Sequence, residues 1–135
     1  MARTLKYRLL PQALAVCRLA PGTPNPGWVL NGEFSCIVRT PGETSIVTAE
    51  NLVPPDLEGI AVEGGWVAFE LEGPFPFAMT GVLASFIHPL AKASVPVFAI
   101  STFDTDYVLI KNENLKQALT ALGEAGHRLI SEQQI

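Results

Sequence analysis

Charge is scarce in this sequence, since Asp, Glu, Lys and Arg together make up 16% of its 135 residues. Nine basic residues face thirteen acidic ones, so the net charge is −4. Nucleic-acid-binding proteins need a basic surface, and this balance argues against that class. Hydrophobic residues reach 48% of the chain. This excess predicts an apolar face that must be covered, and a second copy of the chain, in a homodimer, is the expected cover.

Cysteine, histidine and long apolar runs are also scarce. The two cysteines, Cys17 and Cys36, lie in strand-like runs and are interpreted as buried thiols in a reducing compartment. With no Cys-x-x-Cys pair and only two histidines, neither a metal site nor a cofactor is predicted. No run approaches the roughly 18 apolar residues of a membrane span, and we read no signal peptide at the N-terminus. No membrane association and a cytoplasmic location are therefore expected.

Recognisable catalytic motifs are missing as well. The glycine-containing stretch GPFPFAMTG lacks the lysine and the spacing of a phosphate-binding loop. Glu70 and Glu72 share a strand face, but no histidine or serine motif lies near them in sequence. No catalytic residue is assigned, and the chain is not expected to be an enzyme.

The first half of the chain reads as mostly β structure, interrupted by the proline- and glycine-rich breaks PGTPNPG and VPPDLEG. KYRLL and LAVCRL have strand character. EFSCIVRT and TSIVTAE read as a hairpin, because both carry β-branched residues and Pro41-Gly42-Glu43 separates them. A short helical turn is expected near residues 28–31. Residues 1–65 are predicted to form a partial, mostly β unit.

The second half, residues 66–135, has the rhythm of a β-α-β-β-α-β unit. A helix is predicted from TGVLASFIHPLAKA, in which Pro89 should remove the bond to the Ser85 carbonyl and kink the last turn. NENLKQALTALGEAG predicts a second helix that Gly126 closes, and HRLI a last strand. This order is typical of the ferredoxin-like α+β fold, with both helices on one face of an antiparallel sheet.

The segment STFDTD, residues 101–106, interrupts two apolar strand-like runs with five polar side chains around Phe103. A tight hairpin prefers Asn-Gly or Asp-Gly, and this connection contains no glycine. It is either an ordinary polar turn or a polar clamp held between two rigid strands.

The helix start GVLASF, the segment LEGPFPFAMTGVL and the segment ISTFDTDY resemble the ACT domain. More narrowly, they resemble bacterial tandem-ACT proteins related to the cytosolic arginine sensors of animals. The resemblance is close over residues 66–131 and looser over residues 10–50. It implies a ferredoxin-like ACT unit preceded by a partial ACT-like unit. It also implies a regulatory module that binds an amino acid at an interface between two ACT units.

The resemblance further implies which residues contact the ligand. They are Gly81, Val82, Leu83, Thr102, Phe103, Thr105 and Asp106. The physical chemistry of these positions is compatible with that role. Glycine lets a ligand approach the backbone, and the first N–H groups of a helix can bind a carboxylate. Asp104 or Asp106 could balance an ammonium group, and Phe103 could pack on an aliphatic or cationic side chain.

Each of these positions also has a structural interpretation. Gly81 could ease helix packing, the aspartates could cap a turn, and Phe103 could belong to the core. His88 reads as a packed or surface residue, and His127 shows no sign of a special role. At the level of function, the alternatives are a ligand-free oligomerisation module of ACT type, an enzyme with an unfamiliar site, and an RNA-binding module. The last would need aromatic residues among Lys and Arg on the central strands, and the sequence offers few.

Overall fold

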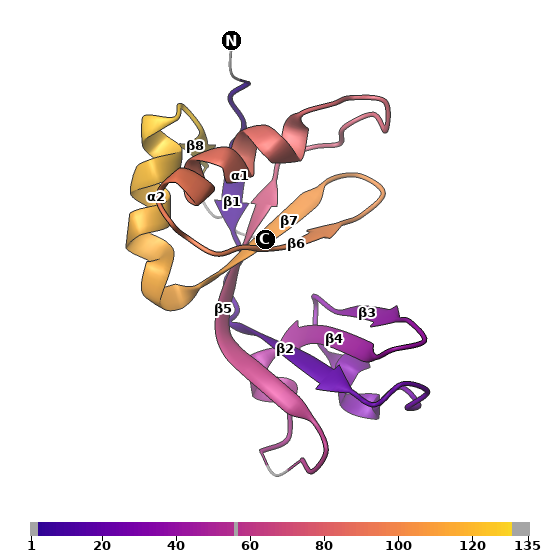
Figure 1. The fold of residues 1–135 in the computed structure, drawn as a ribbon. Coiled ribbons are helices and arrows are strands. Elements are labelled where there is room, and N and C mark those ends of the chain that lie inside the picture. Colours follow the sequence, from indigo (N-terminus) through magenta and orange to yellow (C-terminus); the bar gives the residue numbers. More distant parts are fainter. Residues whose placement is uncertain (1–2, 56, 131–135) are drawn as a thin grey trace. The chain divides into compact units, whose positions relative to one another are not determined.

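The computed structural model describes residues 3–55 and 57–130 and divides the chain into two units (Figure 1). One, here called the inserted unit, is Gln12–Trp66. The other, the discontinuous unit, combines Met1–Pro11 with Val67–Ile135. The sequence prediction placed residues 1–65 together, whereas in the structure the strand Lys6–Leu9 pairs within the discontinuous unit.

The inserted unit is an antiparallel sheet with strand order β3-β4-β2-β5. Its elements are β2 (Leu14–Leu19), η1 (Gly27–Asn31), β3 (Cys36–Arg39), β4 (Thr44–Ala49), η2 (Glu50–Leu52) and the first part of β5 (Ala61–Leu71). The β3–β4 hairpin has the predicted turn, where the Thr40 hydroxyl accepts bonds from the Gly42 and Glu43 N–H groups. Cys17 is buried and Cys36 is half-buried, and both thiols are free.

The discontinuous unit has the ferredoxin-like order of elements, so the predicted α+β fold is confirmed. Its sheet runs β6-β7-β5-β1-β8. Its elements are β1 (Lys6–Leu9), the end of β5, α1 (Val82–Lys92), β6 (Phe98–Ser101), β7 (Asp106–Lys111), η3 (Asn112–Asn114), α2 (Leu115–Glu124) and β8 (Arg128–Leu129). Figure 1 shows α1 and α2 next to each other in this unit. Neither is long or apolar enough to cross a membrane, nor is any other helix within the described part of the chain.

Strand β1 lies between β5 and β8, antiparallel to the former and parallel to the latter. It is held there by burial, because Tyr7 is 1% exposed and packs edge-on against Phe69 and Phe86, with ring centroids 5.1 Å apart in both pairs. Phe69 comes from β5 and Phe86 from α1. The N-terminal strand therefore completes the core between the helices and the sheet.

Both helices end in a Schellman motif, in which a left-handed residue lets the chain fold back on the last turn. After α2 this residue is Gly126 (φ 93°), and the His127 N–H donates to the Leu122 carbonyl at 3.0 Å. After α1 it is Ser94 (φ 62°), and the Val95 N–H donates to the Leu90 carbonyl at 2.9 Å. A serine in this conformation carries strain that glycine would not.

His127 supplies a hydrogen bond that Pro89 of α1 cannot make. Pro89 has no N–H for the Ser85 carbonyl, and His127 Nε2 takes over this bond at 2.8 Å. On its other side, Nδ1 accepts the Leu5 N–H at 3.0 Å. Both bonds together require a neutral ring that carries its proton on Nε2. His127 is only 4% exposed, and it thus links α1 to the residue before β1 and to the start of β8. The sequence had indicated no special role for this residue.

Candidate functional site

The STFDTD segment forms the connection between β6 and β7, with Ser101 paired to Asp106. Its turn of four residues contains no glycine, and the hydrogen bonds across it are made by a threonine. The Thr102 N–H donates to the Thr105 carbonyl at 2.8 Å, and the Thr102 hydroxyl accepts the Thr105 N–H at 3.2 Å. One part of the predicted polar clamp thus serves to close the turn.

The hairpin is also tied to the end of β5 and to the loop that follows it. Thr105 Oγ1 donates to the Leu71 carbonyl at 2.7 Å, and the Phe75 N–H donates to the Asp104 carbonyl at 2.9 Å. Gly73 passes so close that a Cβ there would lie 2.9 Å from the Asp104 carbonyl oxygen. These contacts fix the hairpin against the segment that leads into α1.

A cavity of about 250 Å³ lies between this hairpin, the loop before α1 and the first turn of α1. It is lined by Phe75, Pro76, Phe77, Met79, Val82 and Ser101–Asp106. Of the seven predicted ligand contacts, five line it: Val82, Thr102, Phe103, Thr105 and Asp106. Gly81 lines a different cavity, and Leu83 packs half-buried against the core. The cavity is slightly smaller than the 300–1,000 Å³ of drug-sized ligand sites, which suits a ligand of amino-acid size.

Gly81 is needed for its backbone conformation. It is the N-cap of α1 with φ 80°, a left-handed conformation that favours glycine, and no side-chain cap is bonded there. A Cβ would meet nothing within 4 Å, so close packing is not the reason for this glycine. The N–H groups of the first turn have no partner within the helix and can therefore bind an anion.

The opposite wall of the cavity is acidic and aromatic. Asp106 accepts a hydrogen bond from Ser101 Oγ, and Asp104 lies exposed in the loop. Tyr107, the next residue but not part of the lining, has its pKa raised by burial and further by the charges of Glu70 and Asp104. At the rim, Phe103 and Phe77 are 78% and 77% exposed and meet edge-on, with ring centroids 4.8 Å apart. A cation is therefore favoured on this side, whereas an anion is favoured at the helix tip.

Comparison with known proteins identifies relatives of both units. A family model described as the ACT domain matches residues 61–124, and a model for an N-terminal domain matches residues 12–56. The crystal structure of protein Atu0741 from Agrobacterium tumefaciens is 34% identical in sequence, covers 98% of this chain and 97% of its own, and superposes with a TM-score of 0.89. The chain belongs to the tandem-ACT family. The resemblance seen in GVLASF and ISTFDTDY is thus confirmed.

Two further proteins resemble this ACT protein, one in sequence and one in fold. Human CASTOR3P is 31% identical over 93 residues, which is 62% of this chain. The chain spans 57% of the length of that protein. The ligand-free regulatory subunit of aspartate kinase from Thermus thermophilus has the same fold, with a TM-score of 0.64 at 11% identity, over 93% of this chain and 99% of that one.

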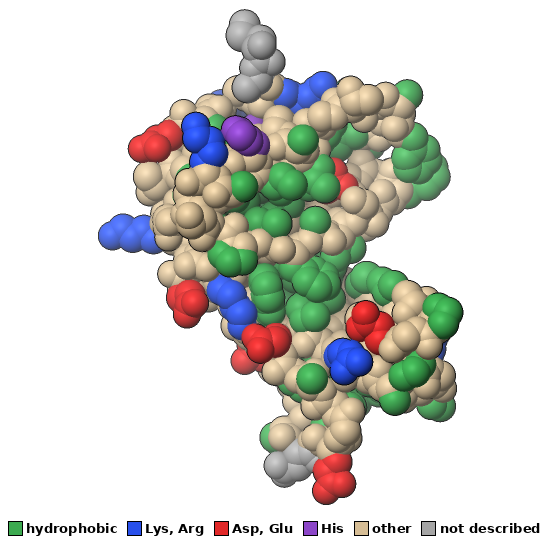
Figure 2. Space-filling view, viewed as in Figure 1, with side chains coloured by type: hydrophobic (Ala, Val, Ile, Leu, Met, Phe, Trp, Pro, Cys, Tyr) green, Lys and Arg blue, Asp and Glu red, His purple; other side chains and the backbone are tan. Residues whose placement is uncertain are grey.

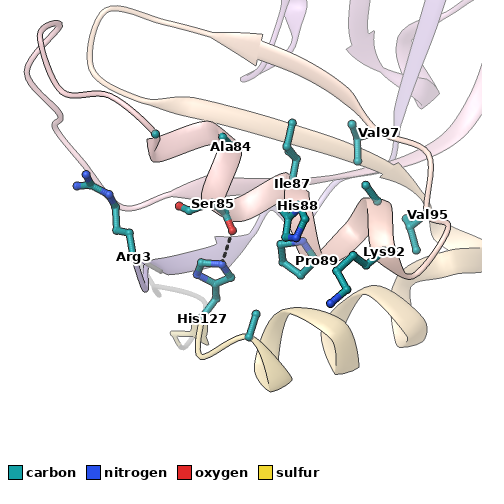
Figure 3. Close-up of a pocket in the computed structure, with 13 residues that line it drawn as sticks. Arg3, Ala84, Ser85, Ile87, His88, Pro89, Lys92, Val95, Val97 and His127 are labelled. Atoms are coloured by element: carbon teal, nitrogen blue, oxygen red, sulfur yellow. Dashed lines mark hydrogen bonds between the residues drawn. The ribbon is translucent and has the colours of Figure 1, made fainter. Parts of the chain in front are cut away.

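Sequence reasoning missed part of the cavity wall of this ACT protein. Phe75, Pro76, Phe77 and Met79 line the cavity but were not among the predicted contacts. Their signal was available, because they lie in the PFPFAM stretch directly before the helix start. A larger cavity of about 830 Å³ beside α1 was not predicted, although Gly81 lines it (Figure 3).

Proposed function

We propose that this ACT protein is a non-enzymatic regulatory module that binds an amino acid in the cavity between the first turn of α1 and the 102–106 hairpin. The observation that carries the proposal is the convergence on one cavity of five residues whose roles the resemblance implied. The ligand carboxylate would meet the N–H groups of the first turn of α1. Its ammonium group would meet Asp106, and its side chain would pack against Phe103 and Phe77.

The proposal extends to an interface. Phe77 and Phe103 are large, apolar and mostly exposed, and such side chains at the rim of a site are typical of a surface that a second module covers. We propose that the ACT unit of a second copy of the chain provides this cover in a homodimer. The ligand would then contact both copies and stabilise their association. At a hundredfold excess over its dissociation constant, such a ligand contributes about 2.7 kcal/mol.

A screen of the twenty amino acids by thermal shift, followed by calorimetry, tests the proposal. At least one amino acid should raise the melting temperature and bind with a measurable affinity. Asp106→Asn keeps the shape of the side chain and should weaken binding at least tenfold. Glu113→Gln removes an equal charge from the exposed η3 segment, away from the cavity, and should leave the affinity unchanged.

The screen also separates the alternative function. A ligand-free oligomerisation module of ACT type would dimerise in solution and show no stabilisation by any of the twenty amino acids. The exposed Phe77–Phe103 pair is compatible with that role too, because it would form an apolar contact without a ligand. Equal affinity of Asp106→Asn and the unaltered chain for a bound amino acid would refute the assigned site.

A further inference from the structure

The larger cavity is a groove along the outer side of α1, about 830 Å³ in volume, and it lies in the discontinuous unit (Figure 3). Its lining comes from four places in the chain: the residue Arg3 before β1, the helix α1, the segment that leads into β6, and the turn after α2. Most of the lining is apolar, including Ile87, Pro89, Val95 and Val97. In Figure 2, hydrophobic side chains gather over the region of α1 and β6, with a histidine and basic side chains beside them.

The polar groups in the floor of this groove already have hydrogen-bond partners within the protein. The Ser85 carbonyl accepts from His127 Nε2 at 2.8 Å, and the Ser85 hydroxyl donates to the Val82 carbonyl at 2.9 Å. His127 Nδ1 is taken by the Leu5 N–H. The floor therefore offers a ligand an apolar surface, and polar recognition is left to the rim.

The ionisable side chains at the rim of the groove are all basic. Arg3, His88 and Lys92 line the groove, and no Asp or Glu is found among the described residues that line it. In a chain with thirteen acidic and nine basic residues, this selection of basic side chains favours an anionic ligand. Arg3 is held in place, because its two terminal nitrogens donate to Met79 Sδ and to the Thr80 carbonyl, each at 3.1 Å. A guanidinium has five donors, so three stay available for a carboxylate.

The groove is elongated. Arg3 lies at one end in Figure 3, and Val95 and Val97 lie toward the other end, with Ile87 between them. The eleven residues of α1 give a length of roughly 16 Å at about 1.5 Å per residue. We infer that this groove is a second ligand site, which binds a linear aliphatic carboxylate. Its carboxylate pairs with Arg3, and its apolar chain lies along Ile87 toward Val95 and Val97.

This site is separate from the proposed amino-acid cavity, although both touch the start of α1. Gly81 lines the groove, and Val82, the next residue, lines the amino-acid cavity. The two inferences can therefore fail independently. Asp106→Asn should leave carboxylate binding unchanged, because Asp106 is not part of the groove.

The test uses decanoate as probe, with the full chain labelled with nitrogen-15 and titrated by NMR and calorimetry. Decanoate should shift the amide resonances of α1 residues such as Ala84 and Ala91, and butyrate, with its short chain, should bind at least tenfold more weakly. Arg3→Gln should weaken decanoate binding about tenfold, which corresponds to about 1.4 kcal/mol. Lys92→Gln removes the only lysine among the described lining residues and should change the affinity less than twofold.

A second variant tests the course of the aliphatic chain. Val97 is 37% exposed, so Val97→Glu should fold normally and abolish decanoate binding by placing a charge in the path of the chain. The inference is overturned if decanoate does not bind, if decanol binds as tightly as decanoate, or if Arg3→Gln leaves the affinity unchanged. A larger loss from Lys92→Gln than from Arg3→Gln would overturn the assigned orientation.

Discussion

Replacing His127 by alanine should be one of the most damaging single substitutions in the discontinuous unit. The ring bonds the Leu5 N–H at 3.0 Å and the Ser85 carbonyl at 2.8 Å, and its removal leaves both groups without their partner. An orphaned buried polar group costs about 1–3 kcal/mol. The Leu5 bond is buried and the Ser85 bond partly so, which predicts a loss of about 2–4 kcal/mol in the free energy of unfolding.

The structure allows this loss to be divided between the two bonds. In a Pro89→Ala background, the new N–H at position 89 can bond the Ser85 carbonyl within the helix, so only the Leu5 N–H remains orphaned. His127→Ala should then cost about 1–2 kcal/mol less than in the unaltered chain. Urea denaturation of the four proteins of this double-mutant cycle, followed by circular dichroism, measures the difference.

A matched control comes from the other histidine. His88 lies exposed on α1, and His88→Ala should change the stability by less than about 0.5 kcal/mol. The reasoning is refuted if His127→Ala costs less than about 1 kcal/mol, or if its cost is the same with proline and with alanine at position 89. The first result would mean that the two bonds do not hold β1 and α1 in place, and the second that the bond to the Ser85 carbonyl adds nothing measurable.

Three further substitutions or treatments have defined outcomes. Ser94→Gly should raise the free energy of unfolding by about 0.5–1 kcal/mol, because it relieves the left-handed serine after α1, and a lower urea midpoint would contradict this. Gly73→Ala should destabilise the fold by about 1–3 kcal/mol and disturb the amide resonances of the hairpin, since its Cβ would press on the Asp104 carbonyl; an unchanged NMR spectrum would contradict the close approach. Burial raises the pKa of Cys17 and of Cys36, so less thiolate is present at neutral pH than in a free thiol. Iodoacetamide should therefore alkylate both slowly in the native protein and faster as the pH rises, as mass spectrometry can follow, and labelling at the rate of an unfolded control would show that the thiols are not protected.

Much of the fold was predictable because local periodicity encodes it. The order β-α-β-β-α-β and the stripe Val82, Phe86 and Leu90 follow from residue spacing alone. The place of Lys6–Leu9 in the sheet could not be predicted from residue spacing, because a strand of four residues carries no information on its partners. Its pairing with β5 and β8 depends on residues sixty or more positions away.

The candidate site was predictable in its motifs but not in its geometry. Successive residues of a helix point about 100° apart, so Val82 and Leu83 cannot both face the same cavity, and Gly81 precedes the helix in a left-handed conformation. Val82 belongs to the core and also lines the cavity at the hairpin, Leu83 packs half-buried against the core, and Gly81 lines the groove. The role of His127 escaped prediction for a different reason. It depends on the Ser85 carbonyl, which Pro89 leaves without a helical donor far from His127 in sequence, and no motif around His127 indicates this contact.

The anchored β6–β7 turn has a consequence for the proposed binding of an amino acid. Because Thr105 and Asp104 are fastened to the backbone of residues 71–75, that wall of the cavity is assembled when the chain folds, before any guest arrives. This wall then loses little entropy when the proposed ligand binds, which lowers the cost of binding. Selectivity among ligands would consequently come from shape and charge at the rim of the cavity, and hardly from rearrangement of the anchored wall.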